Sequence, residues 1–379
     1  MSKIIYFSRL LPQEDKGGGS RRLLQIHDFL KRIHPQVELV HPWRSDLIPV
    51  EKMKQINTRS REKSFHSFPL PGIFINKWSE EHRGMIYRFR EYSRVWLRAV
   101  PGLGKLDLAV MDDPIYFLPL FKKLIRRRVP VIAVCQNIES LVPGQVKKER
   151  ARELLEKELE LLSQCRLVIT ISREEDVILR NFGIVSRYMP YYPVESIQKR
   201  LLAIREKRRF TSKEDILMVG TPKNLPTREG MIRAASYWNE KRLDKTAGKL
   251  IIGGFFSEEY LASLPVGDSV EYHGTFSNEG LDRVMEKVKA CLCYQESGAG
   301  ALTRICEMLI AGVPVLANTH AVRSYYNMKG VFEFRELDEL EEALKQIDAF
   351  DGDIPLPPAP DLSSLEVAMK KILHRTVDI

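Results

Sequence analysis

The stretch ACLCYQESGAGALTRICEMLIAGVPVLAN, residues 290–318, reads as a short strand, a glycine-rich turn, a helix and a second short strand. At 100° per residue, the helical part, residues 301–311, gathers its apolar side chains on one stripe. That stripe consists of Leu302, Ile305, Cys306 and Leu309. A strand, helix and strand in this order form the repeating unit of a parallel sheet with helices packed on its faces.

The same alternation of apolar strands and amphipathic helices runs along most of the 379 residues. It predicts an α/β protein with two Rossmann-like, doubly wound domains that face a cleft. A chain of this length also suits two domains. The predicted strands are 3–8, 36–41, 106–111, 129–135 and 166–172, followed by 216–220, 249–254, 269–274, 290–295 and 313–318.

The alternation breaks near residues 193–213, where prolines and aromatic residues are followed by a run of charges. Residues 44–100 interrupt it as well, and we expect them to be irregular apart from a helix at 78–98. The predicted organisation is an N-terminal domain at 1–195, a linker at 196–213, a C-terminal domain at 214–360 and a terminal helix at 361–379.

Composition is that of a globular protein, with 44% hydrophobic and 29% charged residues. No apolar run approaches the ~20 residues of a membrane-spanning helix. The first residues, MSKIIYFSRL, are too short and interrupted for a signal peptide, so we expect a cytoplasmic protein. The cysteines follow no zinc spacing and are expected in the cores. They are Cys135, Cys165, Cys291, Cys293 and Cys306.

The net charge of +9 indicates an anionic partner, although basic runs are also common on solvated helix faces. Much of the excess lies in two runs, 122–128 and 199–209. They carry no nucleic-acid motif, so we expect no specific nucleic-acid partner. The basic and aromatic segment 74–92 either packs on its domain or touches an anionic membrane surface. The second alternative predicts peripheral attachment to the inner face of a membrane.

The turn Gly298-Ala299-Gly300 precedes the predicted helix, whose first N–H groups can bind an anion. Glu307 lies on the same helix face as Arg304, opposite the apolar stripe. A carboxylate accepts hydrogen bonds from hydroxyl groups. Together these residues suit a diphosphate beside a ribose. The alternative is an ordinary turn followed by a surface ion pair between Arg304 and Glu307.

The segment GAGALTRICEMLIAGVPVLAN resembles the nucleotide-sugar signature of GT-B glycosyltransferases, and in particular the retaining family 4. That signature is a glycine-rich loop, a helix that carries a glutamate, and the pattern A-x-G-x-P-V. Glu307, Gly312, Pro314 and Val315 are in register with it. The resemblance implies that the loop amides bind the donor diphosphate and that the helix glutamate binds the ribose hydroxyls. The implied donor residues are Gly298, Ala299, Gly300, Ala301, Leu302, Thr303 and Glu307.

Other segments resemble the same family. The run KGGGSRR at 16–22 is similar to its N-terminal glycine-rich loop, and CQNIES at 135–140 to a segment on the acceptor side. The run ILMVGTPKN at 216–224 resembles the first strand of the donor domain, and VEYHGTFSNE at 270–279 the region beside the nucleobase. The terminal helix is expected to cross back to the N-terminal, acceptor-binding domain. The residues implied are Gly18, Gly19 and Asn137 on the acceptor side, and Gly220, Lys223 and Gly274 on the donor side.

The sequence also departs from the family pattern. Relatives often carry a second glutamate eight residues before the first, where this chain has Ala299, and Glu296 is the nearest replacement. Where relatives have a histidine, this chain has Gln136, which cannot act as a general base. Retaining transfer in this family is thought to rely on the departing diphosphate, which needs charge stabilisation. The catalytic residues expected are therefore Glu296 and Arg304.

The function that follows from the resemblance is transfer of a sugar from a nucleoside diphosphate to a glycan, a lipid-linked sugar or another acceptor, with retention, as in polysaccharide biosynthesis. The nucleotide sugar is a co-substrate, and we expect no cofactor and no metal. The acidic runs MDDP at 111–114 and DGD at 351–353 are expected to form turns or caps. Two alternatives stay open: an epimerase that acts on a nucleotide sugar, and an inactive scaffold subunit.

Overall fold

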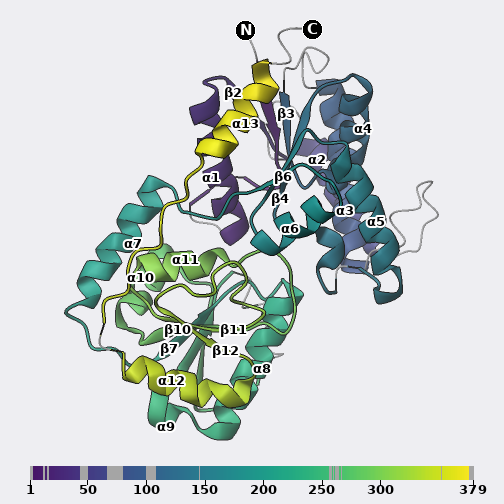
Figure 1. Ribbon diagram of the computed structural model, residues 1–379. Coiled ribbons are helices and arrows are strands. Elements are labelled where there is room, and N and C mark those ends of the chain that lie inside the picture. The colour runs from purple at the N-terminus through teal and green to yellow at the C-terminus, as the bar shows by residue number, and fades with distance from the viewer. Residues whose placement is uncertain are drawn as a thin grey trace. The chain divides into compact units, whose positions relative to one another are not determined.

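A computed structural model describes the chain at residues 3–11, 13–14, 17–42, 50–65, 80–99, 108–144, 146–255, 258, 260, 264–265, 267–350 and 352–374. Within it the chain divides into two compact units (Figure 1). Unit 1 comprises Met1–Gln13, Leu23–Pro190 and Pro360–Ile379, and unit 2 comprises Glu14–Arg22 and Tyr191–Ala359. The domain boundaries expected from the sequence, at residues 195, 213 and 360, stay predictions. Most of the segment predicted as a linker forms helix α7, Glu195–Arg208, in unit 2.

Unit 1 contains a parallel six-stranded sheet, in the order β2-β1-β3-β4-β5-β6. Its strands are short because each crosses the core once between two helical layers. They are β1 (Ile4–Phe7), β2 (Val37–Val40), β3 (Leu108–Asp112), β4 (Val131–Cys135), β5 (Leu167–Thr170) and β6 (Ser186–Tyr188).

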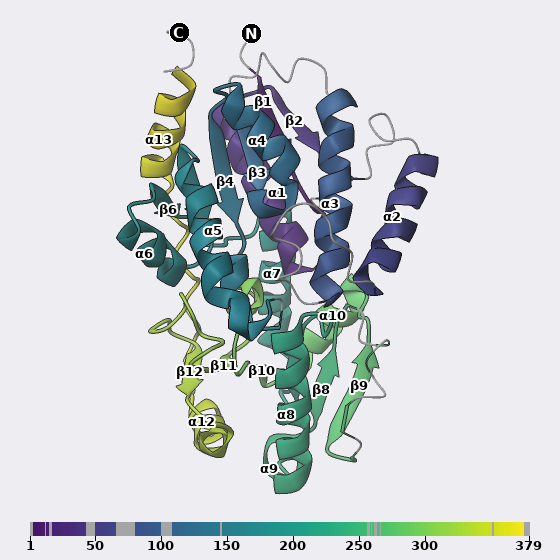
Figure 2. The ribbon, with the colours of Figure 1, turned by 90° about the vertical axis from the view of Figure 1, so that its right-hand side faces the viewer.

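Successive side chains of these strands enter two different cores, as the period of a strand requires. Ile4 and Tyr6 pack against helices α1 (Gly18–Ile33) and α13 (Ser363–His374). Ile5 and Phe7 belong to the core on the other face, with residues of α2 to α6. Figure 2 shows the helices on both sides of this sheet. Helices α4 (Leu118–Arg126), α5 (Ala151–Ser163) and α6 (Arg173–Asn181) connect the later strands.

The segment expected to be irregular contains an additional helix. Besides α3 (Glu80–Ala99), which was predicted, the chain forms α2 (Val50–Phe65). The sequence of α2 is highly charged and therefore lacks a clear apolar stripe. Its Ile56 is buried in the core of unit 1.

The aromatic side chains of α3 face the core. Ile86, Phe89, Tyr92 and Trp96 are buried in unit 1, so this part of the segment 74–92 packs on its domain instead of presenting its apolar face to a membrane. Residues 74–79 lie outside the described part of the chain. None of the described helices is both long enough and apolar enough to span a membrane.

Unit 2 repeats the plan with the strand order β12-β11-β10-β7-β8-β9, again parallel. Helices α8 (Leu225–Lys241) and α12 (Leu340–Asp348) share one core with it, and α10 (Asn278–Lys287) and α11 (Thr303–Ile310) follow β9 and β10. The short helix α9 is Asp244–Ala247. The strands are β7 (Ile216–Val219), β8 (Leu250–Gly253), β9 (Val270–Gly274), β10 (Ala290–Cys293), β11 (Val315–Asn318) and β12 (Val331–Phe334).

Arginines of α7 bind the carboxyl terminus of α11. Arg205 donates through Nε to the carbonyl of Ile310 at 2.8 Å and through Nη2 to that of Leu309. Arg208 donates through Nε to the carbonyl of Gly312 at 2.9 Å. The last carbonyls of a helix lack intrahelical partners and carry partial negative charge, so these guanidinium groups stabilise the helix end. Arg205 and Arg208 of the basic run 199–209 therefore stabilise the fold of unit 2.

We expect Arg205→Met to lower the unfolding midpoint of unit 2 by about 4–8 °C, because charge-assisted hydrogen bonds to the end of α11 contribute about 2 kcal/mol. Thermal unfolding followed by circular dichroism measures the shift. Arg209→Met is the matched control, because exposed Arg209 pairs only with Glu206 of its own helix among the described residues. Equal midpoints for the two variants would show that the cap contributes nothing.

Candidate active site

The glycine-rich turn follows β10 and leads into α11. Gly298 and Gly300 have φ angles of +133° and +69°, which residues with a side chain rarely adopt. The helix ends at Gly312, where φ is +72°. There the N–H of Gly312 donates to Leu309 and that of Val313 to Met308, the pair of hydrogen bonds that defines a Schellman motif. The alternating pattern A-x-G-x-P-V thus ends the helix and starts β11.

Arg323 holds the glycine-rich turn in place, and the sequence analysis missed it. Its Nε donates to the carbonyl of Gly300 at 3.2 Å, and its Nη2 to that of Ala299 at 3.3 Å. Nη2 also donates to the side chain of Gln295 at 3.2 Å. The turn's carbonyls thereby face Arg323. No sequence signal marks an arginine more than twenty positions away as the partner of this turn.

Two helices begin at the same place in unit 2. A Cβ atom at Gly18, the first residue of α1, would lie 2.2 Å from Oγ1 of Thr303, the first residue of α11. Only glycine permits this approach. The side chains of Ser172 and Ser277 cap α6 and α10, whereas Leu302, the N-cap residue of α11, makes no such hydrogen bond. The first N–H groups of α11 are therefore available to an anion.

Arg304 lies beside this point. Its Nη1 is 2.6 Å from where a Cβ atom of Gly220 would be, so the guanidinium packs against the backbone at the end of β7. Within the described part of the chain, Arg304 forms no ion pair with a carboxylate. The sequence alternative in which Arg304 pairs with Glu307 is therefore wrong. The side chain of Arg304 also forms a hydrogen bond with Cys293.

Glu307 is buried, with 6% of its surface exposed. Its Oε2 pairs with Arg21, and its Oε1 accepts a hydrogen bond from the hydroxyl of Tyr191 at 2.5 Å. Burial raises the pKa of Tyr191, and the negative charge of Glu307 adds to that shift. Helical phase correctly turned Glu307 away from the apolar stripe. Arg21 and Tyr191 cover the carboxylate of Glu307, and no local sequence pattern connects either residue with Glu307.

The side chain of Glu296 contacts a different part of unit 2. Its carboxylate pairs with Arg233 of α8 at 2.9 Å, and 38% of the side chain is exposed. It also accepts a hydrogen bond from the hydroxyl of Tyr294 at 3.2 Å. The structure therefore gives Glu296 two partners outside the group formed by Gly18, Thr303 and Arg304. Its catalytic role stays a prediction.

The remaining donor-side predictions lie along the carboxyl edge of the unit 2 sheet. The N–H of Gly220 donates to Gly253 at 3.0 Å, and the N–H of Gly254 to Gly274 at 2.8 Å. Lys223 is exposed in the turn before α8. Ala301 and Leu302 complete the turn before α11, and Gly19 follows Gly18 in the first turn of α1.

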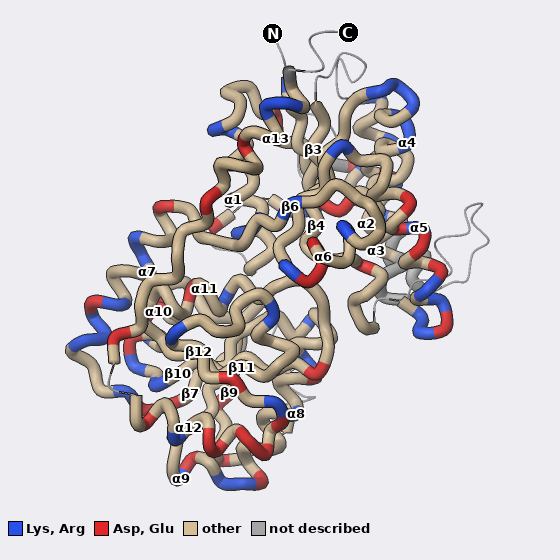
Figure 3. Tube along the Cα trace, viewed as in Figure 1, with Lys and Arg blue, Asp and Glu red and all other residues tan. Residues whose placement is uncertain are grey.

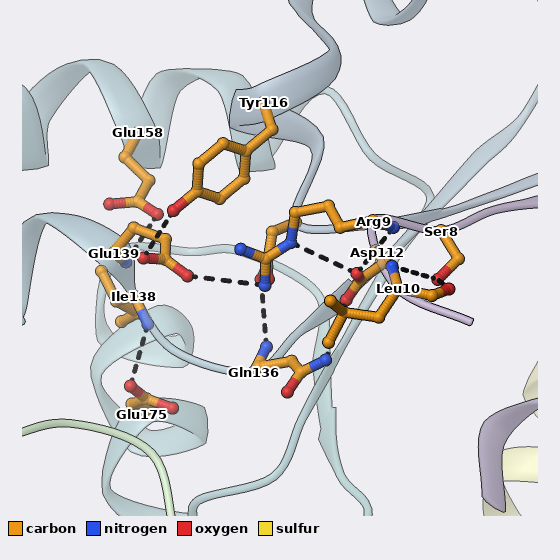
Figure 4. Close-up of polar contacts among 11 residues, drawn as sticks. Ser8, Arg9, Leu10, Asp112, Tyr116, Gln136, Ile138, Glu139, Glu158 and Glu175 are labelled. Carbon is orange, nitrogen blue, oxygen red and sulfur yellow. Dashed lines mark hydrogen bonds and ion pairs between the residues drawn. The ribbon is translucent and has the colours of Figure 1, made fainter. Parts of the chain in front are cut away.

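Unit 1 has a buried polar cluster at the carboxyl ends of β1, β3 and β4 (Figure 4). Arg9 donates to Asp112 from its backbone N–H at 3.2 Å and its Nε at 3.3 Å, and its Nη2 pairs with Asp113. Gln136 donates its backbone N–H to Asp113 at 3.0 Å and its side-chain amide to Asp112 at 3.2 Å. Arg9 also lies over the ring of Tyr116 at 4.4 Å. The aspartate pair predicted as a turn or cap thus anchors Arg9 and Gln136.

Within this cluster, Asp113 has a strained backbone conformation. Its φ of +46° is left-handed, a conformation that costs energy for a residue other than glycine. Burial raises the pKa of Asp113 well above its usual range, and the charge of Arg9 opposes that shift. Burial also raises the pKa of Glu139, which accepts hydrogen bonds from Tyr116 and Asn137. Asn137, predicted on the acceptor side, thereby belongs to the cluster.

Two further carboxylates hold the chain after β4. Glu158 of α5 accepts the backbone N–H groups of Glu139 and Ser140 at 2.9 and 2.8 Å. Glu175 of α6 accepts that of Ile138 at 2.9 Å. These bonds fix the segment that begins with Gln136 and Asn137. Among the described residues, no group of three or more His, Cys, Asp or Glu side chains is arranged to hold a metal ion.

No family model and no curated protein sequence matches the chain. Among solved structures, a sucrose-phosphate synthase from Thermosynechococcus elongatus is similar, with 16% identity, a TM-score of 0.60, and 99% of this chain and 95% of that chain covered. The chain has the GT-B fold.

Two more solved structures with this fold are HepE from Anabaena in complex with UDP-glucose, and the UDP-GlcNAc 2-epimerase from Methanocaldococcus jannaschii in complex with UDP-GlcNAc and UDP. The first has 12% identity and a TM-score of 0.56, and 99% of this chain and 93% of that chain are covered. The second has 14% identity and a TM-score of 0.54, and 100% and 99% are covered. The predicted fold class is confirmed. Membership of the retaining family 4 and the cleft between the domains stay predictions.

We expect the stability of the protein to fall as the pH rises from about 4.5 to about 7, because burial raises the pKa of Glu158 from 4.5 to about 7. A carboxyl with a raised folded-state pKa binds its proton more tightly in the folded protein, so its contribution, about 3 kcal/mol here, is lost as it ionises. Denaturant unfolding across this pH range should show a flatter profile for Glu158→Gln.

Glu156→Gln is the matched control, since Glu156 lies on the same helix with 62% of its side chain exposed. It should keep the wild-type profile. A Glu158→Gln profile as steep as that of the wild type would contradict the assignment.

Proposed function

We propose that the protein is a glycosyltransferase that moves a sugar from a nucleoside diphosphate sugar to an acceptor with retention of configuration. The observation that supports it most directly is the meeting of two helix amino termini at Gly18 and Thr303. Each helix start carries about half a positive charge, so two of them beside one point favour a group with more than one negative charge. A diphosphate fits that requirement.

Arg304 adds a full charge to this place. It stands at the first turn of α11, and within the described residues no carboxylate neutralises it. In the proposed complex the guanidinium binds the diphosphate and stabilises the charge that develops as the sugar leaves. The N–H groups at the start of α11 and the backbone of Gly298 and Gly300, which lacks side chains, would complete the cradle.

Glu307 is proposed to bind the ribose hydroxyls, as the family resemblance implies. Arg21 and Tyr191 each occupy one of its carboxylate oxygens. A carboxylate oxygen has a second lone pair, so each can still accept a hydroxyl hydrogen bond. Arg21 and Tyr191 would then orient the carboxylate while the ribose binds.

The acceptor is proposed to bind at the carboxyl edge of the unit 1 sheet, near Gln136 and Asn137. The carboxylates of this region, Asp112 and Asp113, are 0% and 2% exposed, and they are engaged with Arg9 and Gln136. They are therefore poor candidates for an exposed base. This favours a reaction in which the leaving diphosphate takes the acceptor proton, as proposed for retaining enzymes of this kind.

Arg304→Met should weaken binding of nucleoside diphosphates about tenfold to a hundredfold, because a charge-assisted bond to phosphate contributes about 1.5–3 kcal/mol. Binding of the matching nucleoside, which lacks phosphates, should change little. Isothermal titration with uridine, guanosine and adenosine diphosphates and their nucleosides measures both. Arg335→Met, at an exposed position of unit 2, is the control. An equal loss for nucleoside and diphosphate would exclude the phosphate contact.

The reaction itself is tested with a panel of nucleotide sugars and acceptors, by measuring released nucleotide and the anomeric configuration of the product by NMR. We expect a product with the anomeric configuration of the donor. An inverted product would contradict retention. Inversion at C2 of the donor sugar without an acceptor would identify an epimerase, and nucleotide binding without turnover under all conditions would identify a scaffold.

A further inference from the structure

Unit 1 ends on one side with α6 and the edge strand β6, and Figure 2 shows α6 on the outer side of α5. Gly183, with φ of +72°, ends α6 in a Schellman motif: its N–H donates to Arg180 and that of Ile184 to Leu179. The sharp turn places Phe182 and Val185 at the tip of this edge. We call the exposed surface of residues 173–187 the α6 tip.

The α6 tip exposes three large apolar side chains within nine residues. Phe182 is 61% exposed, Val185 58% and Val177 56%. A single exposed apolar residue is common on any protein, but a group of this kind marks a contact surface. A Cβ atom at Gly183 would meet no atom within 4 Å, so the turn itself projects into open space.

The exposed charges of the α6 tip are positive. Arg173, Arg180 and Arg187 are exposed. The acidic residues of the same segment are largely covered: Glu175 and Asp176 are 3% and 5% exposed, and Asp176 pairs with Arg180 at 2.7 Å. Glu174 is partly covered and accepts a hydrogen bond from Ser172. The surface therefore combines an apolar tip with a positive surround.

We propose that the α6 tip binds an anionic lipid bilayer. Phe182 and Val185 enter the boundary between headgroups and acyl chains, and the arginines contact the anionic headgroups. This combination gives an interfacial site its two favourable terms, burial of apolar surface and attraction to the negative surface potential. The arginine stems can also lie along the apolar boundary while their charged ends stay in water.

The same charges disfavour a second copy of the chain as the occupant. A symmetric dimer contact brings each patch against itself, so three exposed arginines would face three others. Pairing of β6 with another strand is also disfavoured, because β6 has only three residues and Arg187 is exposed on it. An anionic surface with an apolar interior satisfies both features of the tip.

Vesicle binding tests the proposal with the full chain. We expect sedimentation with phosphatidylcholine vesicles that contain phosphatidylglycerol, and much weaker binding to phosphatidylcholine alone. Phe182→Ser with Val185→Ser should lower the partition coefficient about tenfold or more. Replacing Arg173, Arg180 and Arg187 by glutamine should lower it about fivefold per residue and remove the salt dependence. With anionic vesicles, Phe182→Trp should shift its fluorescence to shorter wavelengths.

Two variants serve as matched controls. Phe210→Ser removes a phenylalanine of unit 2 that is 89% exposed, also next to basic residues. Replacing Arg126, Arg127 and Arg128 by glutamine removes an exposed basic run elsewhere in unit 1, visible at α4 in Figure 3. Both should retain most of the binding. Wild-type protein that does not bind anionic vesicles overturns the proposal, as does binding that the controls abolish and the α6 tip variants leave intact. Binding of the tip to an acidic protein but to no vesicle would overturn it as well.

Discussion

The approach of Gly18 to Thr303 is the contact on which the candidate donor site depends. Any side chain at Gly18 would overlap Thr303, so the start of α1 and the start of α11 can meet only with glycine there. The other features of the site follow from that meeting. Arg21, one turn further along α1, reaches Glu307, one turn further along α11. The positive helix starts and the buried ion pair are thus two consequences of one close approach.

The two units place charged side chains differently at their sheet edges. At its sheet edge, unit 2 presents Arg304 with no carboxylate partner among the described residues, together with uncapped N–H groups. Unit 1 buries Asp112, Asp113 and Glu139 around Arg9. Burial raises the pKa values of Asp113 and Glu139, and the nearby charge of Asp112 adds to both shifts. Burying these carboxylates costs free energy. Their hydrogen bonds to Gln136 in turn fix the loop near which the acceptor is proposed to bind.

The sequence predicted the fold class because strand and helix periods are local properties. The period of two that sends Ile4 and Ile5 into different cores is visible in any strand of the chain. Helix α2 was missed because its sequence is highly charged, and among its described side chains Ile56 is the one that is buried. In the candidate site, helical phase separated Glu307 from the core stripe. It could not reveal Arg21, Tyr191 or Arg323 as partners, because those contacts join residues far apart in the chain.

The turn before α11 explains how a site of this kind can lack the first of two glutamates. The carbonyl of Ala299, at the position where that glutamate would stand, accepts a hydrogen bond from Arg323, and so does that of Gly300. The turn is therefore held by its backbone, between two glycines with positive φ, and not by a side chain at 299. The carboxylate of Glu296 pairs with Arg233 of α8, and replacement of the missing carboxylate by Glu296 stays a prediction. In the proposed reaction, positive charge at this site stabilises the leaving diphosphate, and the reaction requires that charge more than it requires a second carboxylate.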